Sequence, residues 1–511
     1  MTALNQYLSH QLQNEATQAM VKDITSDRWF TGAEVAEDVA SFAARLTAAK
    51  VGRGDTLLIC LPNRAVFLPL EQAAWQLGVA VHPIAPDTPL PELLADQAEH
   101  HYAAMVLQPR LAAQLPGGDY QVTPLAMILA QDLRLAVVAA AVANRASAPS
   151  GTVQEDDLAL IMHTSGTTGK PKRVGLTHRI VANAARHDAE SNTMSADTVA
   201  LITMPMFHIN SQVMVTQAIR YAGGKIVIAP KFSASRYWNW VADNGVDWTA
   251  VVPTIISFLL LNEHSLATYD ARQAEIHLRF VRSSSFALPE ERLREFQDRF
   301  HTTIIEGYGM TEASSQCTIN PFDAPKIGSA GKAVGTDVAI HTAAGEFTTA
   351  PNVDGEIAIR GDHVITSYLD PHPDAFVDGW FLTGDLGYFD ADEYLFVRGR
   401  SKEIISRGGE KVAPAAVESV LAELDFIEQL AVIGLPDPLY GEEVTAVVVT
   451  THPGANEAAD RQTILEYGRA RLAKFEAPTR VEFVRSFPRN TTGKVLRPAL
   501  RDQLLAIGAA K

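Results

Sequence analysis

Short apolar runs alternate with longer amphipathic stretches over the first 350 or so residues. The short runs are rich in β-branched residues and bounded by turn residues, which predicts strands, and the longer stretches repeat apolar residues at helical spacing. The predicted strands are 56–61, 79–84, 158–163, 199–204, 225–229 and 249–252, and the predicted helices are 31–49, 67–77 and 178–192. This alternation predicts α/β layers with largely parallel sheets.

The pattern changes at about Gly355, where the segments GEIAIRG, GWFLTGD and EYLFVRG predict short strands separated by turns. A compact tail follows, with predicted helices at 414–424 and 461–472 and predicted strands at 431–434 and 444–451. We therefore predict an α/β protein with two domains that meet near Gly399. Residues 1–399 form a large N-terminal domain of layered α/β sheets plus a small β subdomain, and residues 400–511 form a small C-terminal α+β domain. The Ala- and Gln-rich segment 116–150 carries no clear prediction.

Composition narrows the class of protein. A chain of 511 residues with 47% hydrophobic and 20% charged residues has the balance of a globular protein with more than one core. Its formal net charge of −16 disfavours nucleic acid and anionic membrane as partners, so a polyanionic ligand needs a local basic site. Two cysteines, Cys60 and Cys317, supply neither a disulfide framework nor a metal cluster. The apolar run at 135–143 is too short for membrane insertion, and the first residues lack the order of a signal peptide, so a cytoplasmic location is expected.

The strongest local motif is a glycine- and hydroxyl-rich segment directly after the predicted strand 158–163. Its glycines allow tight turns that present N–H groups to phosphate, and its hydroxyls and lysine add donors and positive charge. A Walker P-loop is excluded, because two residues rather than four separate the glycines and Pro171 follows the lysine. An ordinary polar turn remains the alternative. The predicted nucleotide-binding residues are Thr164, Ser165, Gly166, Thr167, Thr168, Gly169 and Lys170.

Three further motifs lie downstream in the chain. In the segment 306–312, Tyr308 offers an aromatic face for adenine, Thr311 a hydroxyl for an α-phosphate, and Glu312 a carboxylate of the kind that Mg²⁺ prefers. Asp385 follows a glycine turn and suits the two hydroxyls of a ribose, although an Asp often stabilises its own turn. Arg400 offers another hydroxyl or phosphate contact. Lys494 follows a glycine turn near the C-terminus and, taken alone, is equally a solvated surface lysine.

In this order, the motifs resemble those of the adenylate-forming superfamily, which comprises acyl-CoA synthetases, peptide-synthetase adenylation domains and luciferases. The resemblance covers about 31–500. It implies that ATP activates a carboxylic acid as an acyl-adenylate, and that the phosphate loop contacts the β- and γ-phosphates. It also implies that Thr311 and Glu312 contact the α-phosphate and Mg²⁺, that Asp385 and Arg400 hold the ribose, and that Lys494 bridges carboxylate and α-phosphate.

The same resemblance implies a mobile C-terminal domain and an acceptor thiol. Lys402 matches the hinge about which this domain swings, and Gly409 matches a position where the pantetheine arm of CoA passes close to the backbone. Tyr440 matches either a CoA contact or a core residue. His208 follows Phe207, where peptide-synthetase domains have an Asp, and no carrier domain is expected after Lys494; both features favour a free-standing CoA ligase.

The resemblance also outlines the acid pocket, whose predicted residues are His208, Ser284, Gly309, Met310 and Ser315. Serines replace small apolar residues at 283–285, and hydroxyls suit a short polar acid better than an alkyl chain. The segments around Arg282 and Glu312 are most similar to oxalate–CoA ligases, except that Ser315 stands where those enzymes have a histidine. Three alternatives remain open: a medium- or long-chain fatty acid–CoA ligase, an enzyme that loads a carrier protein or an amine, and a catalytically silent binding protein.

Overall fold

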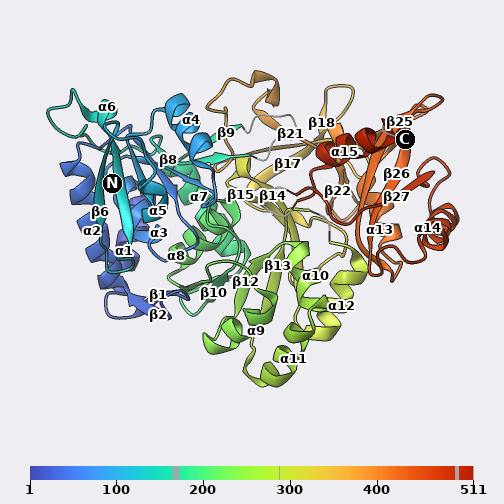
Figure 1. The fold of residues 1–511 in the computed structure, drawn as a ribbon, viewed down its shortest axis with the longest axis horizontal. Coiled ribbons are helices and arrows are strands. Elements are labelled where there is room, and N and C mark those ends of the chain that lie inside the picture. The colour runs from blue at the N-terminus through green and yellow to red at the C-terminus, as the bar shows by residue number, and fades with distance from the viewer. Residues whose placement is uncertain (165–171, 287, 490–493, 510–511) are drawn as a thin grey trace.

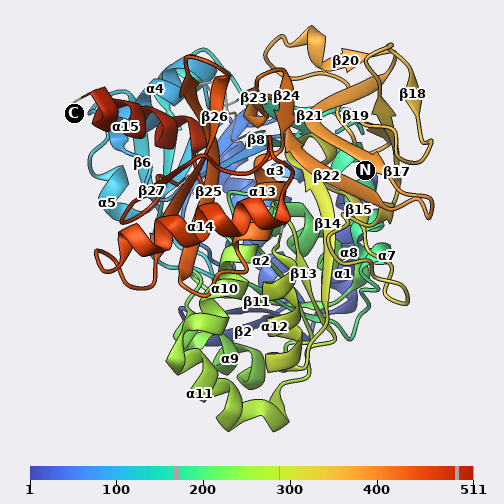
Figure 2. The ribbon, with the colours of Figure 1, turned by 90° about the vertical axis from the view of Figure 1, so that its right-hand side faces the viewer.

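The computed structural model describes residues 1–164, 172–286, 288–489 and 494–509, and it contains four β-sheets (Figure 1). The N-terminus lies at one end of the long axis of the molecule and the C-terminus lies near the other. The strands of two large sheets lie within the first 335 residues. A smaller sheet follows in the chain, and the last sheet belongs to the C-terminal tail (Figures 1 and 2).

The first large sheet has seven strands in the order β6-β7-β5-β3-β4-β8-β9, with a parallel centre and antiparallel edges. Its strands are β3 (Thr56–Cys60), β4 (Ala80–Ile84), β5 (Ala104–Leu107), β6 (Tyr120–Leu125), β7 (Leu133–Val138), β8 (Leu158–His163) and β9 (Arg173–Thr177). The helices of this region are α1 (Ala3–Asn14), α2 (Gly32–Ala48), α3 (Phe67–Gln76), α4 (Leu90–His100), α5 (Pro109–Ala112), α6 (Ala139–Val142) and α7 (His178–Ser191).

The second large sheet has nine strands in the order β16-β15-β14-β13-β12-β10-β11-β1-β2. Its strands are β1 (Ala19–Asp23), β2 (Arg28–Thr31), β10 (Val199–Ile202), β11 (Lys225–Ile228), β12 (Trp248–Val251), β13 (Phe280–Ser283), β14 (Ile304–Met310), β15 (Ser315–Ile319) and β16 (Lys332–Ala333). A π-helical segment, Asn210–Gln217, and α8 (Ala218–Ala222) follow β10, and the remaining helices are α9 (Ala234–Asp243), α10 (Pro253–Leu261), α11 (Glu263–Arg272) and α12 (Glu290–Phe300).

Alternate residues of single strands enter different hydrophobic cores, which defines the layers. In β3, Leu57 and Ile59 belong to the core shared with α1, α2, α3 and α7, whereas Leu58 and Cys60 face a second core that includes Leu93 of α4. In β10, Ile202 faces the shared core, whereas Leu201 packs toward α9–α12. Because successive side chains of a strand point to opposite faces, both sheets are covered on both sides, with one helical layer between them.

The third sheet is the predicted β subdomain and has the order β18-β17-β19-β21-β20, with β22 paired to β21. Its strands are β17 (Thr336–His341), β18 (Phe347–Thr348), β19 (Gly355–Gly361), β20 (Phe376–Val377), β21 (Trp380–Phe389) and β22 (Leu395–Arg400). Short 3₁₀ turns lie at Gln273–Glu275, Thr311–Ala313, Pro373–Ala375 and Ser401–Glu403. The predicted boundary between Gly399 and Arg400 thus falls at the end of β22.

The C-terminal tail forms the fourth sheet, in the order β24-β23-β26-β25 with β27 beside β26. Its elements are β23 (Ile405–Arg407), β24 (Glu410–Val412), α13 (Pro414–Leu421), β25 (Ile427–Asp437), β26 (Gly441–Thr450), α14 (Glu457–Arg471), β27 (Arg480–Phe483) and α15 (Arg497–Ala509). One face of the sheet packs on α13 and α14, and the other contacts α15 (Figure 2).

The predicted fold class is confirmed, and the segment without a prediction is explained. Residues 116–150 contain the antiparallel pair β6 and β7 and the short helix α6, so the apolar run at 135–143 is divided between a strand and a helix. No helix in the described part of the chain is long and apolar enough to cross a membrane. Cys60 and Cys317 are unpaired and buried, 1% and 0% exposed, and burial raises the pKa of the Cys60 thiol to about 12.

Candidate active site

The predicted acid-pocket residues lie at one edge of the nine-stranded sheet. Strands β10, β12, β13 and β14 are mutually parallel, so their carboxyl ends meet at the same edge. His208 lies in the loop after β10, Ser284 follows β13 directly, and Gly309 and Met310 end β14. In open α/β sheets, ligands bind in the crevice outside these carboxyl ends.

The loop that carries His208 is anchored from the other large sheet. The Asn63 side-chain amide donates to the carbonyl of Met204 at 2.8 Å, and its oxygen accepts from the N–H of Met206 at 2.8 Å. The His208 ring packs beside Phe207, with ring centroids 4.4 Å apart. Its Nε2 is buried and has no hydrogen-bond partner among the described residues, and burial lowers the pKa of His208 to about 4. His208 is therefore a neutral imidazole with an unused polar atom.

Ser315 contacts the protein rather than open space. Its hydroxyl donates to Oδ2 of Asp188, on α7, at 2.5 Å, and the side chain is buried. Burial raises the pKa of Asp188 to about 7, although the Ser315 hydrogen bond and the charge of Arg282 both favour its ionised form. The Ser315 carbonyl also limits Gly309, because a Cβ atom on Gly309 would lie 1.7 Å from that oxygen.

A buried arginine side chain contacts the strand pair β14 and β15. Arg282 donates to the side-chain oxygen of Gln316 at 3.1 Å and to the carbonyl of Ser283 at 2.6 Å. A Cβ atom on Gly307 would lie 2.2 Å from Nη2 of Arg282, so only glycine fits above the guanidinium. This support fixes the backbone that carries Tyr308 and Met310.

Two predicted nucleotide-binding residues, Tyr308 and Arg400, meet around a third, Asp385. The Tyr308 hydroxyl donates to Oδ2 of Asp385 at 2.7 Å, and Nε of Arg400 lies 3.2 Å from Oδ1. Asp385 and Arg400 are paired residues of β21 and β22, and Tyr308 comes from β14 of the large sheet. This contact joins the β subdomain to the nine-stranded sheet, and it gives Asp385 a partner beyond its own turn.

Glu312 lies close to this group on the short turn Thr311–Ala313, which also carries Thr311. Its Oε1 accepts a hydrogen bond from the Tyr368 hydroxyl at 2.6 Å, and the ammonium of Lys172 lies 4.6 Å from the centroid of the Tyr368 ring. Although burial opposes the charged form of Arg400, Asp385 and Glu312 both help to raise its pKa. The two carboxylates therefore act on the same guanidinium.

The C-terminal domain contributes Lys494 to this region. Burial lowers the pKa of the Lys494 ammonium and the nearby Arg400 lowers it further, while Glu403 and Asp385 oppose the shift. A lysine on a freely solvated surface would feel none of these charges at close range. The charges of the Asp385–Arg400 pair thus act on Lys494 of the C-terminal domain.

The phosphate motif is described only at its ends. The N–H of Thr164 donates to the carbonyl of Lys172 at 2.9 Å, which closes the base of the loop. Ser165, Gly166, Thr167, Thr168, Gly169 and Lys170 lie outside the described residues.

Lys402 and Gly409 both follow Arg400 in the chain. Lys402 is exposed on the turn Ser401–Glu403, directly after β22. Gly409 sits in the hairpin between β23 and β24 with φ of +92°, and a Cβ there would meet nothing within 4 Å. Tyr440, beside this hairpin, is 48% exposed and stacks under Arg407, which excludes the core-packing alternative.

Several residues of the site carry no recognisable signal in the sequence. Tyr368 is 56 positions from Glu312, and Asp188 is 127 positions from Ser315. Arg282 and Gln316 belong to segments that the sequence had marked, but their pairing depends on the register of β13, β14 and β15.

Comparison with known proteins identifies the family. The sequence profile of the AMP-binding enzyme family matches residues 8–369, and that of the AMP-binding enzyme C-terminal domain matches residues 416–494. A crystal structure of ATP-bound MatB from Rhodopseudomonas palustris has the same fold, with a TM-score of 0.83 and 27% identity over 99% of this chain and all of the other.

Related sequences are ligases that act on different acids. The sulfoacetate–CoA ligase of Cupriavidus necator is 35% identical over 479 residues, 91% of this chain and 90% of the relative. The oxalate–CoA ligase of Arabidopsis thaliana is 35% identical over 359 residues, 68% of each chain, and the long-chain-fatty-acid–CoA ligase FadD13 of Mycobacterium tuberculosis is 32% identical over 476 residues, 90% of each. The chain thus belongs to the AMP-binding enzyme family and is an acid–thiol ligase of the acyl-CoA synthetase type.

Proposed function

We propose that the protein joins a short, polar carboxylic acid to CoA in two steps, with Mg²⁺ and the named site residues in the roles given below. The observation that carries this proposal is that the charges of Arg400 and Asp385, which form an ion pair, act on Lys494, because a cation beside the nucleotide site can neutralise the charge that develops when a carboxylate attacks an α-phosphate. In the first step, a carboxylate oxygen attacks the α-phosphorus and pyrophosphate leaves. In the second, the CoA thiol attacks the acyl carbon and AMP leaves.

The first step brings anions together, so positioning and charge neutralisation supply most of the catalysis. Asp385 accepts from the ribose hydroxyls, assisted by Arg400, and Tyr308 presents its ring to adenine. Thr311 donates to the α-phosphate. Lys494, on which the charges of Asp385 and Arg400 act, has its ammonium where carboxylate and α-phosphate react. The phosphate motif from Thr164 to Lys170 binds the remaining phosphates.

Glu312 fits the role of the residue that holds Mg²⁺. Mg²⁺ takes one or two protein carboxylates together with substrate phosphates, and Glu312 supplies such a carboxylate beside Thr311. The Tyr368 hydroxyl holds one carboxylate oxygen, Oε1, which orients the group. When bound, the metal supplies positive charge to the phosphates.

Glu312→Gln is expected to weaken acyl-adenylate formation by about 10–100-fold and to raise the Mg²⁺ concentration that gives half the maximal rate. The amide keeps the shape of the side chain but lacks the charge that attracts the cation. The measurement is acid-dependent pyrophosphate exchange over a range of Mg²⁺ concentrations. Tyr368→Phe serves as the milder companion, since it removes only the orienting hydroxyl. An unaltered Mg²⁺ dependence in Glu312→Gln would leave Glu312 with a structural role.

For the second step, the C-terminal domain must present a different face to the adenylate. Lys494 and Gly409 belong to the same domain, and the charge of Asp385 acts on Lys494 in this conformation. A swing about Lys402 would withdraw Lys494 and bring the open hairpin at Gly409 to the site. The positive φ and the empty space at Gly409 suit the close passage of a pantetheine arm.

Two features support a short polar acid. His208 offers a buried imidazole nitrogen without a partner, and a polar group on the acid would satisfy it. The hydroxyl of Ser284 lies at the same sheet edge. In agreement, two of the relatives are named for acids that are small and doubly acidic, sulfoacetate and oxalate. A long alkyl chain would instead leave His208 Nε2 and the hydroxyl stranded against hydrocarbon.

Ser284→Ala is expected to reduce kcat/KM for the preferred polar acid by about 1–3 kcal/mol, the usual cost of stranding a buried polar partner. An aliphatic acid of similar length is the internal control and should lose little. Parallel losses for both acids would mean that the substitution disturbs the fold of the pocket rather than a polar contact.

The experiment that tests the whole proposal is a panel of short mono- and dicarboxylates, sulfoacetate and medium- and long-chain fatty acids, each assayed for CoA-dependent AMP formation. The expected result is the highest kcat/KM with a short acid that carries a second polar group. The highest value with a fatty acid would refute the pocket assignment and leave the ligase assignment intact. Pyrophosphate release without transfer to CoA would instead favour a carrier protein or amine as acceptor.

A further inference from the structure

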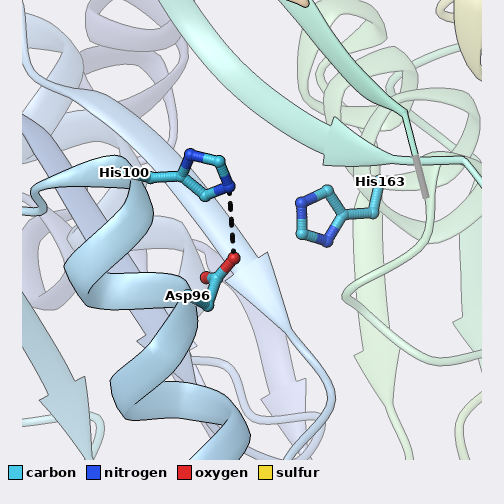
Figure 3. A group of neighbouring side chains, drawn as sticks. All are labelled: Asp96, His100 and His163. Carbon is cyan, nitrogen blue, oxygen red and sulfur yellow. Dashed lines mark ion pairs between the residues drawn. The ribbon is translucent and has the colours of Figure 1, made fainter. Parts of the chain in front are cut away.

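A cluster of three metal-ligating side chains lies between α4 and the end of β8, outside the Asp385–Lys494 site (Figure 3). Asp96 and His100 are one helical turn apart on α4, so both project from the same face of that helix. His163, the last residue of β8, faces them from the sheet (Figure 3). One ligand atom of each residue lies within 4.8 Å of the other two, and all three side chains are half-buried.

The spacing suits a small tetrahedral ion. Nε2 of His100 lies 3.5 Å from Oδ1 of Asp96. Two ligand atoms bound tetrahedrally to Zn²⁺ at about 2.0–2.1 Å are separated by about 3.3–3.4 Å. The separation of the Asp96–His100 pair is therefore close to that of two zinc ligands, and a ligand atom of His163 lies within 4.8 Å of both.

Residues behind the cluster hold the carboxylate as outer partners of a metal site usually do. The Tyr102 hydroxyl donates to Oδ2 of Asp96 at 2.6 Å, which leaves Oδ1 toward His100. Because that hydroxyl has a single proton, the contact of 2.7 Å between Tyr102 and Nδ1 of His82 requires the imidazole N–H to donate. Nε2 of His82 then carries a lone pair.

His82 provides an independent sign that a polar group next to the cluster lacks a partner. The His82 side chain is fully buried, and its Nε2 has no hydrogen-bond partner among the described residues. Its ring packs edge-on against the ring of His163, with centroids 4.5 Å apart. A buried histidine with a bare lone pair thus packs beside His163 of the cluster.

The nearby arginine pairs with a residue outside this cluster, whereas at a comparable cluster an arginine contacts the candidate ligands themselves. Arg173, the strand partner of His163, is paired with Asp370 at 2.8 Å. The other three-residue group found among the described residues consists of His187, Asp362 and His363. There, Nη2 of Arg186 lies 3.3 Å from Asp362 and 3.2 Å from Nε2 of His187, where it would oppose a cation.

We propose that Asp96, His100 and His163 bind a single transition-metal ion of the Zn²⁺ class, with a further coordination position open to water. Two imidazoles and one carboxylate form a ligand set that suits Zn²⁺ better than Mg²⁺. The site joins α4 to the end of β8, and Thr164 of the phosphate motif directly follows His163. Occupancy would therefore restrain the segment from which the nucleotide-binding motif starts.

The test is a calorimetric titration of chelator-treated, nucleotide-free enzyme with Zn²⁺, in buffer that contains millimolar Mg²⁺ to occupy hard-cation sites. The wild-type protein is expected to bind one equivalent. His100→Gln and Asp96→Asn should each weaken binding by more than tenfold. Tyr102→Phe, which leaves all three ligands in place, should weaken it by about 10–100-fold through loss of the outer hydrogen bond. Substitution with Co²⁺ should give the visible spectrum of a four-coordinate ion.

His187→Gln is the matched control, because it removes a ligand from the rejected cluster and should bind Zn²⁺ as the wild type does. Melting temperatures without metal show whether each variant is folded, and Zn²⁺ should raise that of the wild type and His187→Gln alone. The proposal is overturned if the wild type binds no Zn²⁺ at 100 times the concentration of protein sites, or if His100→Gln and Asp96→Asn retain wild-type affinity.

Discussion

Replacing Lys494 with alanine is expected to lower kcat for acyl-adenylate formation by about 10²–10³-fold while ATP binding changes little. The ammonium contributes mainly where charge moves from the α-phosphate to the leaving pyrophosphate, so its loss affects the transition state more than the ground state. Burial and the neighbouring Arg400 already lower the pKa of Lys494, which indicates a site short of solvent where such a charge has most effect. Acid-dependent pyrophosphate exchange measures the loss, and equilibrium binding of ATP measures the affinity.

Lys474→Ala is the matched control, since Lys474 is an exposed lysine of the same domain. It should leave the first step unchanged. Transfer of a preformed acyl-adenylate to CoA should also survive Lys494→Ala, because that step follows the withdrawal of Lys494 in the mechanism that we propose. Near-normal pyrophosphate exchange in Lys494→Ala would remove this residue from the mechanism.

Lys402→Pro is expected to spare most of acyl-adenylate formation and to suppress transfer to CoA by about 10²-fold. Proline fixes φ and disfavours a helical backbone at the preceding Ser401, so it stiffens the turn Ser401–Glu403 through which the domain would rotate. The two half-reactions are measured separately, as pyrophosphate exchange and as single-turnover consumption of the adenylate by CoA.

Lys402→Ala separates the backbone from the charge. It removes the ammonium but leaves the torsion free, and transfer to CoA should then remain close to that of the wild type. Losses of equal size in both half-reactions of Lys402→Pro would mean that the turn supports the fold generally and is not a hinge.

The sequence predicted a strand or helix well where the element's own residues form an apolar run or repeat at helical spacing. Strand β8 was predicted with its observed bounds, and α3 and α7 to within one residue, because continuous apolar runs and helical spacing are local properties. Strand β6 had no such signal: most of its residues are exposed and it contains Pro124. It exists because its backbone pairs with β7 at the edge of the sheet.

The same distinction holds for the site. Motif residues such as Asp385 and Glu312 were marked by their neighbours in the chain. Arg400 meets Asp385 through the pairing of β21 and β22, whereas Tyr308 and Tyr368 reach their partners only through the packing of the β subdomain on the large sheet. The family resemblance placed Ser315 in the acid pocket. Its hydroxyl contacts Asp188, whose burial on α7 cannot be predicted from a strand motif 127 residues away.

The burial of both cysteines makes the enzyme a convenient subject for site-specific labelling. Maleimide reagents require an accessible thiolate, and neither Cys60, with its raised pKa, nor the fully buried Cys317 offers one. A cysteine introduced at Leu439, which is 79% exposed on the C-terminal domain, would therefore react alone in an otherwise native chain. Paired with a second dye on the β6 edge at the exposed Val122, it would report the proposed rotation of the small domain during turnover as a change in energy transfer.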